Sequence, residues 1–171
     1  MLRKPAACDG CPMYGDGAGF VPDELVEGAD TAILMQNPGE EEELEAKPAV
    51  GKSGRLMNVA FLPKAGLERG KVTVANVLKC RWLEPNPKGD RIVNGERCKA
   101  TNKLPPTKVL NAAMQHCMKA HLRLPQSTER VILQGALALK ASGNRVNITG
   151  WRGYEVPLPM AVETTDASDG R

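Results

Sequence analysis

The chain of 171 residues predicts an α/β fold in which helices cover both faces of a parallel sheet. Two observations lead to this prediction. Short, almost continuous apolar runs alternate along the chain with stretches in which apolar residues recur every three or four positions. Strands that are apolar throughout are typical of sheets buried on both sides. We therefore expect one domain over residues 1–171, a three-layer α/β/α sandwich with a central sheet of four parallel strands.

Four segments are predicted to be strands. Residues 31–36 form an apolar run that leads into a turn signal, Asn-Pro-Gly, at residues 37–39. Residues 72–78 are rich in β-branched side chains, and residues 130–134 form a third apolar run. Residues 154–161 predict a weaker fourth strand, which we expect at an edge of the sheet because it contains two prolines.

Three segments are predicted to be helices. Ser53 is suited to cap a helix with one apolar side, and Pro63 marks the end of that helix. A second helix is expected between Thr107 and Pro125, where Leu110, Ala113, Met114 and Cys117 follow helical spacing. A third, rich in alanine and leucine, follows Gly135 and runs to Ser142.

Positive charge is concentrated in one part of the chain. The formal net charge of +3 alone argues neither for nor against nucleic acid. Residues 81–108, however, carry seven Lys or Arg and three acidic residues in a segment rich in proline and glycine. We interpret this segment as a basic loop insertion that either contacts phosphates or is simply solvated.

Five cysteines are the most informative residues for function. Cys8 and Cys11 form a C-x-x-C pair in an N-terminal arm, residues 1–30, and Cys80 and Cys117 follow far along the chain. Four thiolates complete the shell of a zinc ion or of a [4Fe–4S] cluster. A disulfide framework and a redox C-x-x-C pair are the alternatives. No apolar leader precedes the pair and no apolar stretch could span a membrane, so we expect an intracellular protein, cytoplasmic or nucleoid-associated, that uses the cysteines for a metal.

Polar residues follow the predicted strands at residues 36–39, 76–80 and 134–135. In parallel α/β sheets, ligands bind beyond the carboxyl ends of the strands. Polar side chains at the close of an apolar run cost free energy unless they are partnered. The ends of these strands therefore predict a binding site, although Asn76 could equally be satisfied by neighbouring backbone.

Several motifs occur in a distinctive order between residues 8 and 153. After the C-x-x-C pair come P-G-E-E-E-E at residues 38–43, P-A-V-G-K-S-G-R-L-M at residues 48–57, and V-A-N-V-L-K-C-R at residues 74–81. A G-A-L-A segment and an R-G pair follow. In this order they resemble the iron–sulfur uracil-DNA glycosylases, which carry G-E-x-P-G-x-x-E-D, G-x-P-F-V-G-x-x-G-x-L-L, T-N-x-x-K-C-R and G-x-x-A.

The resemblance implies a uracil-DNA glycosylase-like fold and a role for particular residues. The ligands of a [4Fe–4S] cluster would be Cys8, Cys11, Cys80 and Cys117, with Cys98 in an insertion. The base would be bound by Asn37, Pro38, Gly39, Ala49 and Asn76. The DNA, single-stranded or uracil-containing, would be bound by Lys79, Arg81, Arg91, Arg97 and Lys99. Enzymes of this kind flip the base out of the helix before they break its glycosidic bond.

The chain departs from the family at three catalytic positions. Gln36 stands where the family has Glu, and an amide cannot accept the proton of a water molecule. Ala49 stands where a Phe would stack on the base, and Asp166 falls where the family has the His of an H-P-S motif. Glu40 or Glu41 could replace the missing acid. The catalytic candidates are therefore Gln36, Glu40, Glu41 and Asp166.

Two functions of different class follow. The first is a DNA glycosylase that hydrolyses the N-glycosidic bond of uracil or of a damaged base. The second is a non-catalytic DNA-binding accessory module of a replication or repair complex, with a DNA polymerase or another replication protein as its partner. A zinc-bound nucleic-acid protein unrelated to glycosylases is a third interpretation.

Overall fold

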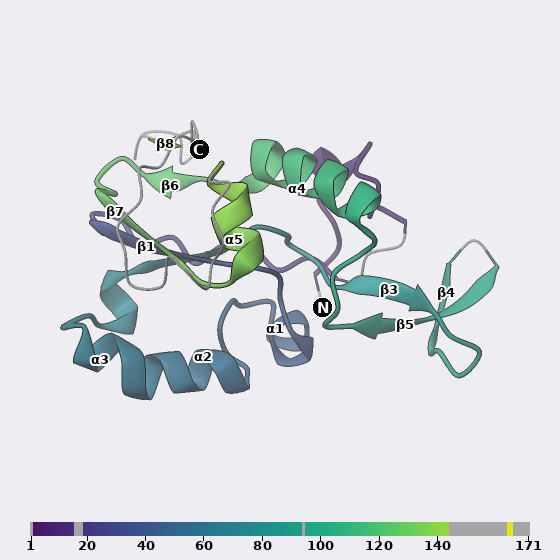
Figure 1. Cartoon of the computed structure of the whole chain (residues 1–171), viewed down its shortest axis with the longest axis horizontal. Helices are drawn as coiled ribbons and strands as arrows, with labels where there is room; N and C mark the ends of the chain where they lie inside the picture. Colours follow the sequence, from purple (N-terminus) through teal and green to yellow (C-terminus); the bar gives the residue numbers. More distant parts are fainter. Residues whose placement is uncertain (1, 16–18, 94, 144–163, 166–171) are drawn as a thin grey trace.

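The computed structural model describes residues 2–15, 19–93, 95–143 and 164–165. Its centre is a parallel sheet in which β1 (Thr31–Met35) lies between β2 (Thr73–Asn76) and β7 (Arg130–Leu133) (Figure 1). Three of the predicted strands, and the mixed α/β architecture, are thus confirmed. The described residues form three strands of this sheet, not four, and residues 154–161 lie outside them.

Apolar side chains of β1 alternate between the two faces of the sheet. Ala32 and Leu34 belong to one buried cluster, which also contains residues of α4 and α5. Ile33 belongs to a second cluster, with Met57 and Leu62 from the opposite helices. This division follows from the two-residue repeat of a strand. Figure 1 shows the same arrangement, with α4 and α5 on one side of the sheet and α2 and α3 on the other.

The helices on the first face match their predicted limits. α4 (Thr107–His121) begins directly after Pro105-Pro106, and α5 (Ala136–Ala141) follows Gly135. Proline is well suited to this position because it needs no hydrogen-bond partner for a backbone N–H. The remaining short elements are η1 (Ala6–Cys8), η3 (Arg69–Lys71), β6 (Leu124–Pro125) and β8 (Thr164–Thr165).

On the opposite face the predicted helix is divided into three segments. These are α2 (Lys52–Leu56), a π-helical turn η2 (Met57–Phe61), and α3 (Leu62–Lys64). The last segment ends at Lys64, one residue after Pro63, close to the predicted end of the helix. α1 (Glu40–Glu45) precedes them and contains the acidic run.

The basic segment 81–108 contains a small antiparallel sheet and is not only a loop. Its strands lie in the order β3 (Trp82–Pro85), β5 (Glu96–Thr101), β4 (Arg91–Val93), and they project away from the parallel sheet (Figure 1). β4 and β5 pair antiparallel, with Val93 opposite Glu96 and Arg91 opposite Cys98. The many charged residues obscured this strand signal in the sequence.

The N-terminal arm is fixed along β2 by backbone hydrogen bonds. The N–H of Val21 donates to the carbonyl of Lys79 over 2.8 Å, and Glu24 and Val74 exchange two bonds of 2.9 Å. These bonds bring the beginning of the chain beside the segment that follows β2. Within the described part of the chain, no helix is long and apolar enough to cross a membrane.

Candidate functional site

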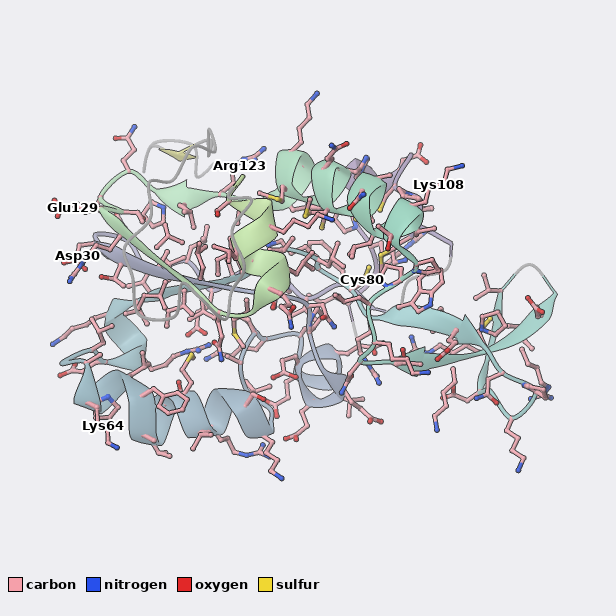
Figure 2. All side chains as sticks on the ribbon, viewed as in Figure 1. Asp30, Lys64, Cys80, Lys108, Arg123 and Glu129 are labelled. Carbon is pink, nitrogen blue, oxygen red and sulfur yellow. The ribbon has the colours of Figure 1, made fainter. Side chains whose placement is uncertain are left out.

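Four of the five cysteines line one small cavity. Cys8 and Cys11 come from the N-terminal arm, Cys80 from the segment after β2, and Cys117 from α4. Figure 2 shows Cys80 in the interior, below α4. Cys98 lies apart from them, buried beside Leu83 in the antiparallel sheet. The structure therefore brings together the four cysteines that the sequence selected and separates the fifth.

Local turns place the first two cysteines at the cavity. The N–H of Cys8 donates to the carbonyl of Pro5 over 2.9 Å, and that of Cys11 donates to the carbonyl of Cys8 over 3.0 Å. The Lys4 ammonium then donates to the backbone carbonyl of Met13 over 2.8 Å. The arm is thus folded tightly around the cavity, and the positive charge of Lys4 lies at its wall.

Burial makes the thiolate form of these cysteines unfavourable in the absence of a bound cation. Burial, together with the neighbouring cysteines, raises the pKa of Cys80 and the pKa of Cys117 to about 12 each. Among the described side chains, no three from His, Cys, Asp or Glu gather closely enough to hold a single metal ion. A zinc ion draws its thiolates to within about 2.3 Å of one point. The four thiols are instead distributed around the cavity wall.

A second site is a cleft of about 650 Å³ at the carboxyl ends of β1 and β7. The predicted residues Gln36, Asn37, Pro38, Gly39, Glu40 and Glu41 all line this cleft. Further lining residues come from the start of α2, from the end of β5 and from the end of β7, namely Lys52, Ser53, Asn102 and Gln134. The cleft lies where a parallel α/β sheet is expected to bind its ligand.

The side-chain amide oxygen of Gln36 lies at the cleft and is already hydrogen-bonded within the protein. Its Oε1 accepts a hydrogen bond of 3.2 Å from the backbone N–H of Leu137, in the first turn of α5. Gly135 has a φ of +97°, and a Cβ at this position would lie only 2.8 Å from the Gln36 side chain. A glycine is therefore required at 135 for both the backbone conformation and the close approach of Gln36.

The carboxylates of the acidic run in α1 differ in whether other residues of the protein bind them. Glu41 forms an ion pair with Arg55, whose hydrogen bond lowers the pKa of the Glu41 carboxyl. Glu42 accepts backbone N–H bonds from Gly39 over 3.0 Å and from Gly51 over 2.7 Å. Glu40 makes no hydrogen bond or ion pair with any residue in the described ranges, so its carboxylate is available to a ligand of the cleft.

Glu43 is buried and connects three parts of the molecule. Its carboxylate accepts hydrogen bonds from the N–H of Gly19 over 2.9 Å, from Arg81 over 3.0 Å and from Arg91 over 2.6 Å. Burial alone would raise the pKa of Glu43, but these bonds together hold that pKa below its ordinary value. The N-terminal arm, α1 and the antiparallel sheet are therefore held together at one carboxylate.

Two residues predicted to bind the base lie behind the cleft wall. Ala49 is 2% exposed, has a φ of +53°, and belongs to the apolar cluster of Ile33. Asn76 is also 2% exposed and is paired in register with Met35, which itself lines the cleft. Its N–H donates to the Asp23 carboxylate over 3.2 Å. Asn76 thus lies next to the cleft, whereas Ala49 is part of the core.

The five basic residues predicted to bind DNA divide into two groups. Lys79 is 1% exposed and is paired with Asp23 over 2.5 Å, while Arg81 is buried in its pair with Glu43. These two side chains stabilise the interior. The partly buried Arg91 also pairs with Glu43, whereas Arg97 and Lys99 are exposed on β5. Asp166, the remaining catalytic candidate, lies outside the described residues.

Sequence reasoning missed two contributors to these sites. Asn102 lines the cleft from the end of β5, and no motif of the sequence distinguished it. Asp23 lies in the arm, and nothing in the sequence distinguished it from the adjacent Glu24. Both depend on contacts between segments that are far apart in the chain.

No family model matches the chain. It is nevertheless similar to several curated proteins named type-4 uracil-DNA glycosylase. It is 32% identical over 98 residues to that of Archaeoglobus fulgidus, which covers 57% of this chain and 48% of the relative. The match to that of Thermotoga maritima is 29% identical over 153 residues, 87% of this chain and 68% of the relative.

A third relative, from Sulfurisphaera tokodaii, is 35% identical over 75 residues, 44% of this chain and 34% of the relative. The matched segments thus cover half or less of the length of two of these three relatives. The motif order, the parallel α/β sheet and these similarities agree with one another. Together they support the assignment of the chain to the uracil-DNA glycosylase superfamily.

Proposed function

We propose that this protein is an iron–sulfur DNA glycosylase that binds uracil-containing DNA and excises the base slowly, with Glu40 as its acid–base residue. The observation that carries this proposal is the cleft of about 650 Å³, on whose wall lies the carboxylate of Glu40, which has no partner among the described residues. A site of this size accommodates a flipped nucleotide base. The named relatives of the chain are uracil-DNA glycosylases, which supports uracil as the base.

Amides around the cleft suit the recognition of a base edge. Gln36, Asn37, Asn102 and Gln134 line it, and each side chain offers both a donor and an acceptor of hydrogen bonds. Asn76 lies beside Met35 on the neighbouring strand, and its backbone N–H is fixed by the Asp23 carboxylate. A neutral base can therefore be bound without a buried charge opposite it.

In the proposed reaction, Glu40 activates a water molecule. The water oxygen forms a bond to C1′ of the sugar while the bond between C1′ and the base nitrogen breaks. The bonding electrons leave with the base, and the water proton passes to the Glu40 carboxylate. Gln36 positions the base or the water but cannot accept that proton, and its Oε1 is already bonded to Leu137. We therefore expect slow excision.

Phosphate contacts are proposed along β5. Arg97 and Lys99 are exposed on this strand, and Asn102, one residue beyond its end, lines the cleft. A DNA strand that follows the basic side chains would therefore be led to the cleft. Such contacts bind DNA without reading its sequence.

The cysteine cavity is proposed to hold a [4Fe–4S] cluster. The donor set of Cys8, Cys11, Cys80 and Cys117 consists entirely of thiols, which is what such clusters require. The resemblance to the iron–sulfur uracil-DNA glycosylases favours such a cluster over a single zinc ion, which four thiolates could also bind. When bound, the cluster would neutralise the buried thiolates and attach the N-terminal arm to α4. Its role would be structural.

Excision is tested with uracil-containing single-stranded DNA and detection of abasic sites. The unmodified protein should form them slowly, and Glu40→Gln should lower the rate by roughly 10²-fold or more, because it removes the acid–base group. Glu41→Gln is the matched control, since Glu41 is paired with Arg55. DNA binding without any abasic sites would instead identify a non-catalytic accessory module.

The cluster is tested by metal analysis of protein purified without oxygen. We expect four irons per chain, lost in Cys117→Ser and retained in Cys98→Ala, because Cys98 lies outside the cavity. A colourless protein with a single zinc would contradict the cluster.

A further inference from the structure

His121 contacts the cysteine cavity from the last position of α4. It lies four residues, about one helical turn, beyond Cys117, so both side chains face the same side of the helix. The Nε2 atom of His121 is 3.1 Å from the sulfur of Cys8, a cysteine that is 113 residues away in the chain. This is a direct contact between an imidazole and one of the four cavity cysteines.

The direction of this hydrogen bond follows from the chemistry of a metal ligand. A cysteine that binds iron does so as a thiolate and carries no proton. The hydrogen in the contact must then belong to His121, which donates from Nε2 to the sulfur of Cys8. Hydrogen bonds to the sulfurs of an iron–sulfur cluster withdraw electron density, and they help to set its reduction potential and stability.

The ring of His121 is held in this orientation. Phe20 packs against it edge to face, with ring centroids 5.0 Å apart and planes inclined at 64°. Phe20 is itself fixed, because its backbone N–H donates to the carbonyl of Leu2 over 3.2 Å. Two segments of the N-terminal arm therefore position the imidazole toward Cys8.

His116 provides an internal comparison. It lies on the same helix and lines the same cavity, but its Nε2 is 3.0 Å from the backbone carbonyl of Ala7. The two histidines thus share their helix and their cavity but have different hydrogen-bond partners. The described contacts give only His121 a cysteine sulfur as its partner.

We infer that His121 is a positioning residue that donates a hydrogen bond to the Cys8 thiolate, and thereby raises the reduction potential of the cluster and slows its loss. This inference rests on the proposed [4Fe–4S] cluster. It gives His121 a role in the properties of the cluster, separate from the chemistry in the cleft.

The test replaces His121 by Phe, which keeps a ring against Phe20 but has no N–H. His121→Phe should retain four irons, show a more negative reduction potential in a redox titration, and lose iron to a chelator roughly tenfold faster. His121→Gln, whose amide can still donate, should lie closer to the unmodified protein. His116→Phe is the matched control, and both its potential and its rate of iron loss should be unchanged.

The outcomes separate this inference from the proposed function. Iron-loaded His121→Phe with the potential and the iron-loss rate of the unmodified protein would overturn the hydrogen bond and leave the cluster intact. His121→Gln shifted as far as His121→Phe would overturn it as well. Equal shifts in His121→Phe and His116→Phe would also overturn it, because the effect would then be one of general packing. Unmodified protein without iron would overturn the cluster itself and this inference with it.

Discussion

The side-chain oxygen of Gln36 accepts a hydrogen bond from the backbone N–H of Leu137 over 3.2 Å. This bond joins the residue that follows β1 to the first turn of α5, across the carboxyl edge of the sheet. The position at which the chain departs from its relatives' motif therefore has a structural role as well as a place on the cleft wall.

Substitutions of Gln36 should separate these two roles. Gln36→Glu keeps an oxygen acceptor for Leu137 and adds a carboxylate to the cleft, so we expect nearly unchanged stability and faster uracil excision. Gln36→Leu removes the acceptor and should lower the free energy of unfolding by about 1 kcal/mol. Urea unfolding and single-turnover excision measure the two effects. Slower excision by Gln36→Glu would show that the amide itself is required.

Gly54→Ala should destabilise the wall behind the cleft. A Cβ at Gly54 would lie 2.0 Å from the carbonyl oxygen of Ala49, a backbone atom that cannot easily move. We expect a loss of about 1–3 kcal/mol in the free energy of unfolding. Gly70→Ala is the matched control, because a Cβ there meets no atom within 4 Å. Similar unfolding midpoints for the two variants would contradict the close approach.

Glu43→Gln should be strongly destabilising at neutral pH. It removes the charge that two arginines share in the interior, and breaking a buried ion pair costs about 3–5 kcal/mol. The pKa of Glu43 is lower in the folded state than its ordinary value, so its contribution to stability is present above the unfolded pKa and disappears as pH falls through the folded pKa.

Urea unfolding of unmodified protein and Glu43→Gln across an acidic pH series checks this expectation. The difference in unfolding free energy between the two should be largest near pH 7 and should shrink as the pH falls below about 4.5, near the ordinary pKa of glutamate. Glu40→Gln, which removes the same charge at a position that pairs with no residue in the described part of the chain, should show little difference at any pH. A constant difference for Glu43→Gln would exclude the ionised carboxylate as its cause.

DNA binding should depend on Arg97 and Lys99. Replacing both by Gln removes two exposed positive charges from β5, and should reduce the slope of log affinity against log salt by roughly 1.5. Lys64→Gln with Lys71→Gln is the control of equal charge, and Lys64 projects outward from α3 (Figure 2). Fluorescence anisotropy over a range of salt concentrations measures both. Equal slopes in the two double variants would show that β5 is not part of the DNA-binding surface.

The sequence by itself predicted the elements whose signals are local. β1, β2 and β7 are short apolar runs, and α4 carries its apolar residues at helical spacing. Backbone propensity and the pattern of buried residues depend on neighbours in the sequence, so these strands and this helix can be predicted from the sequence alone. The order of the motifs also indicated the superfamily, and the resemblance to that superfamily selected the four cysteines that line one cavity.

Only the tertiary structure decided which charged side chains are paired or buried and which are accessible. Glu41 and Glu40 are adjacent in the sequence, yet Arg55 pairs with the first and no described residue pairs with the second. In the same way Lys79 is buried with Asp23, 56 residues away, whereas Lys99 is exposed. The partner of a charged side chain is set by segments that meet in space, and its burial is set by the packing of those segments. Neither the partner nor the burial of a charged side chain can therefore be predicted from the local sequence pattern.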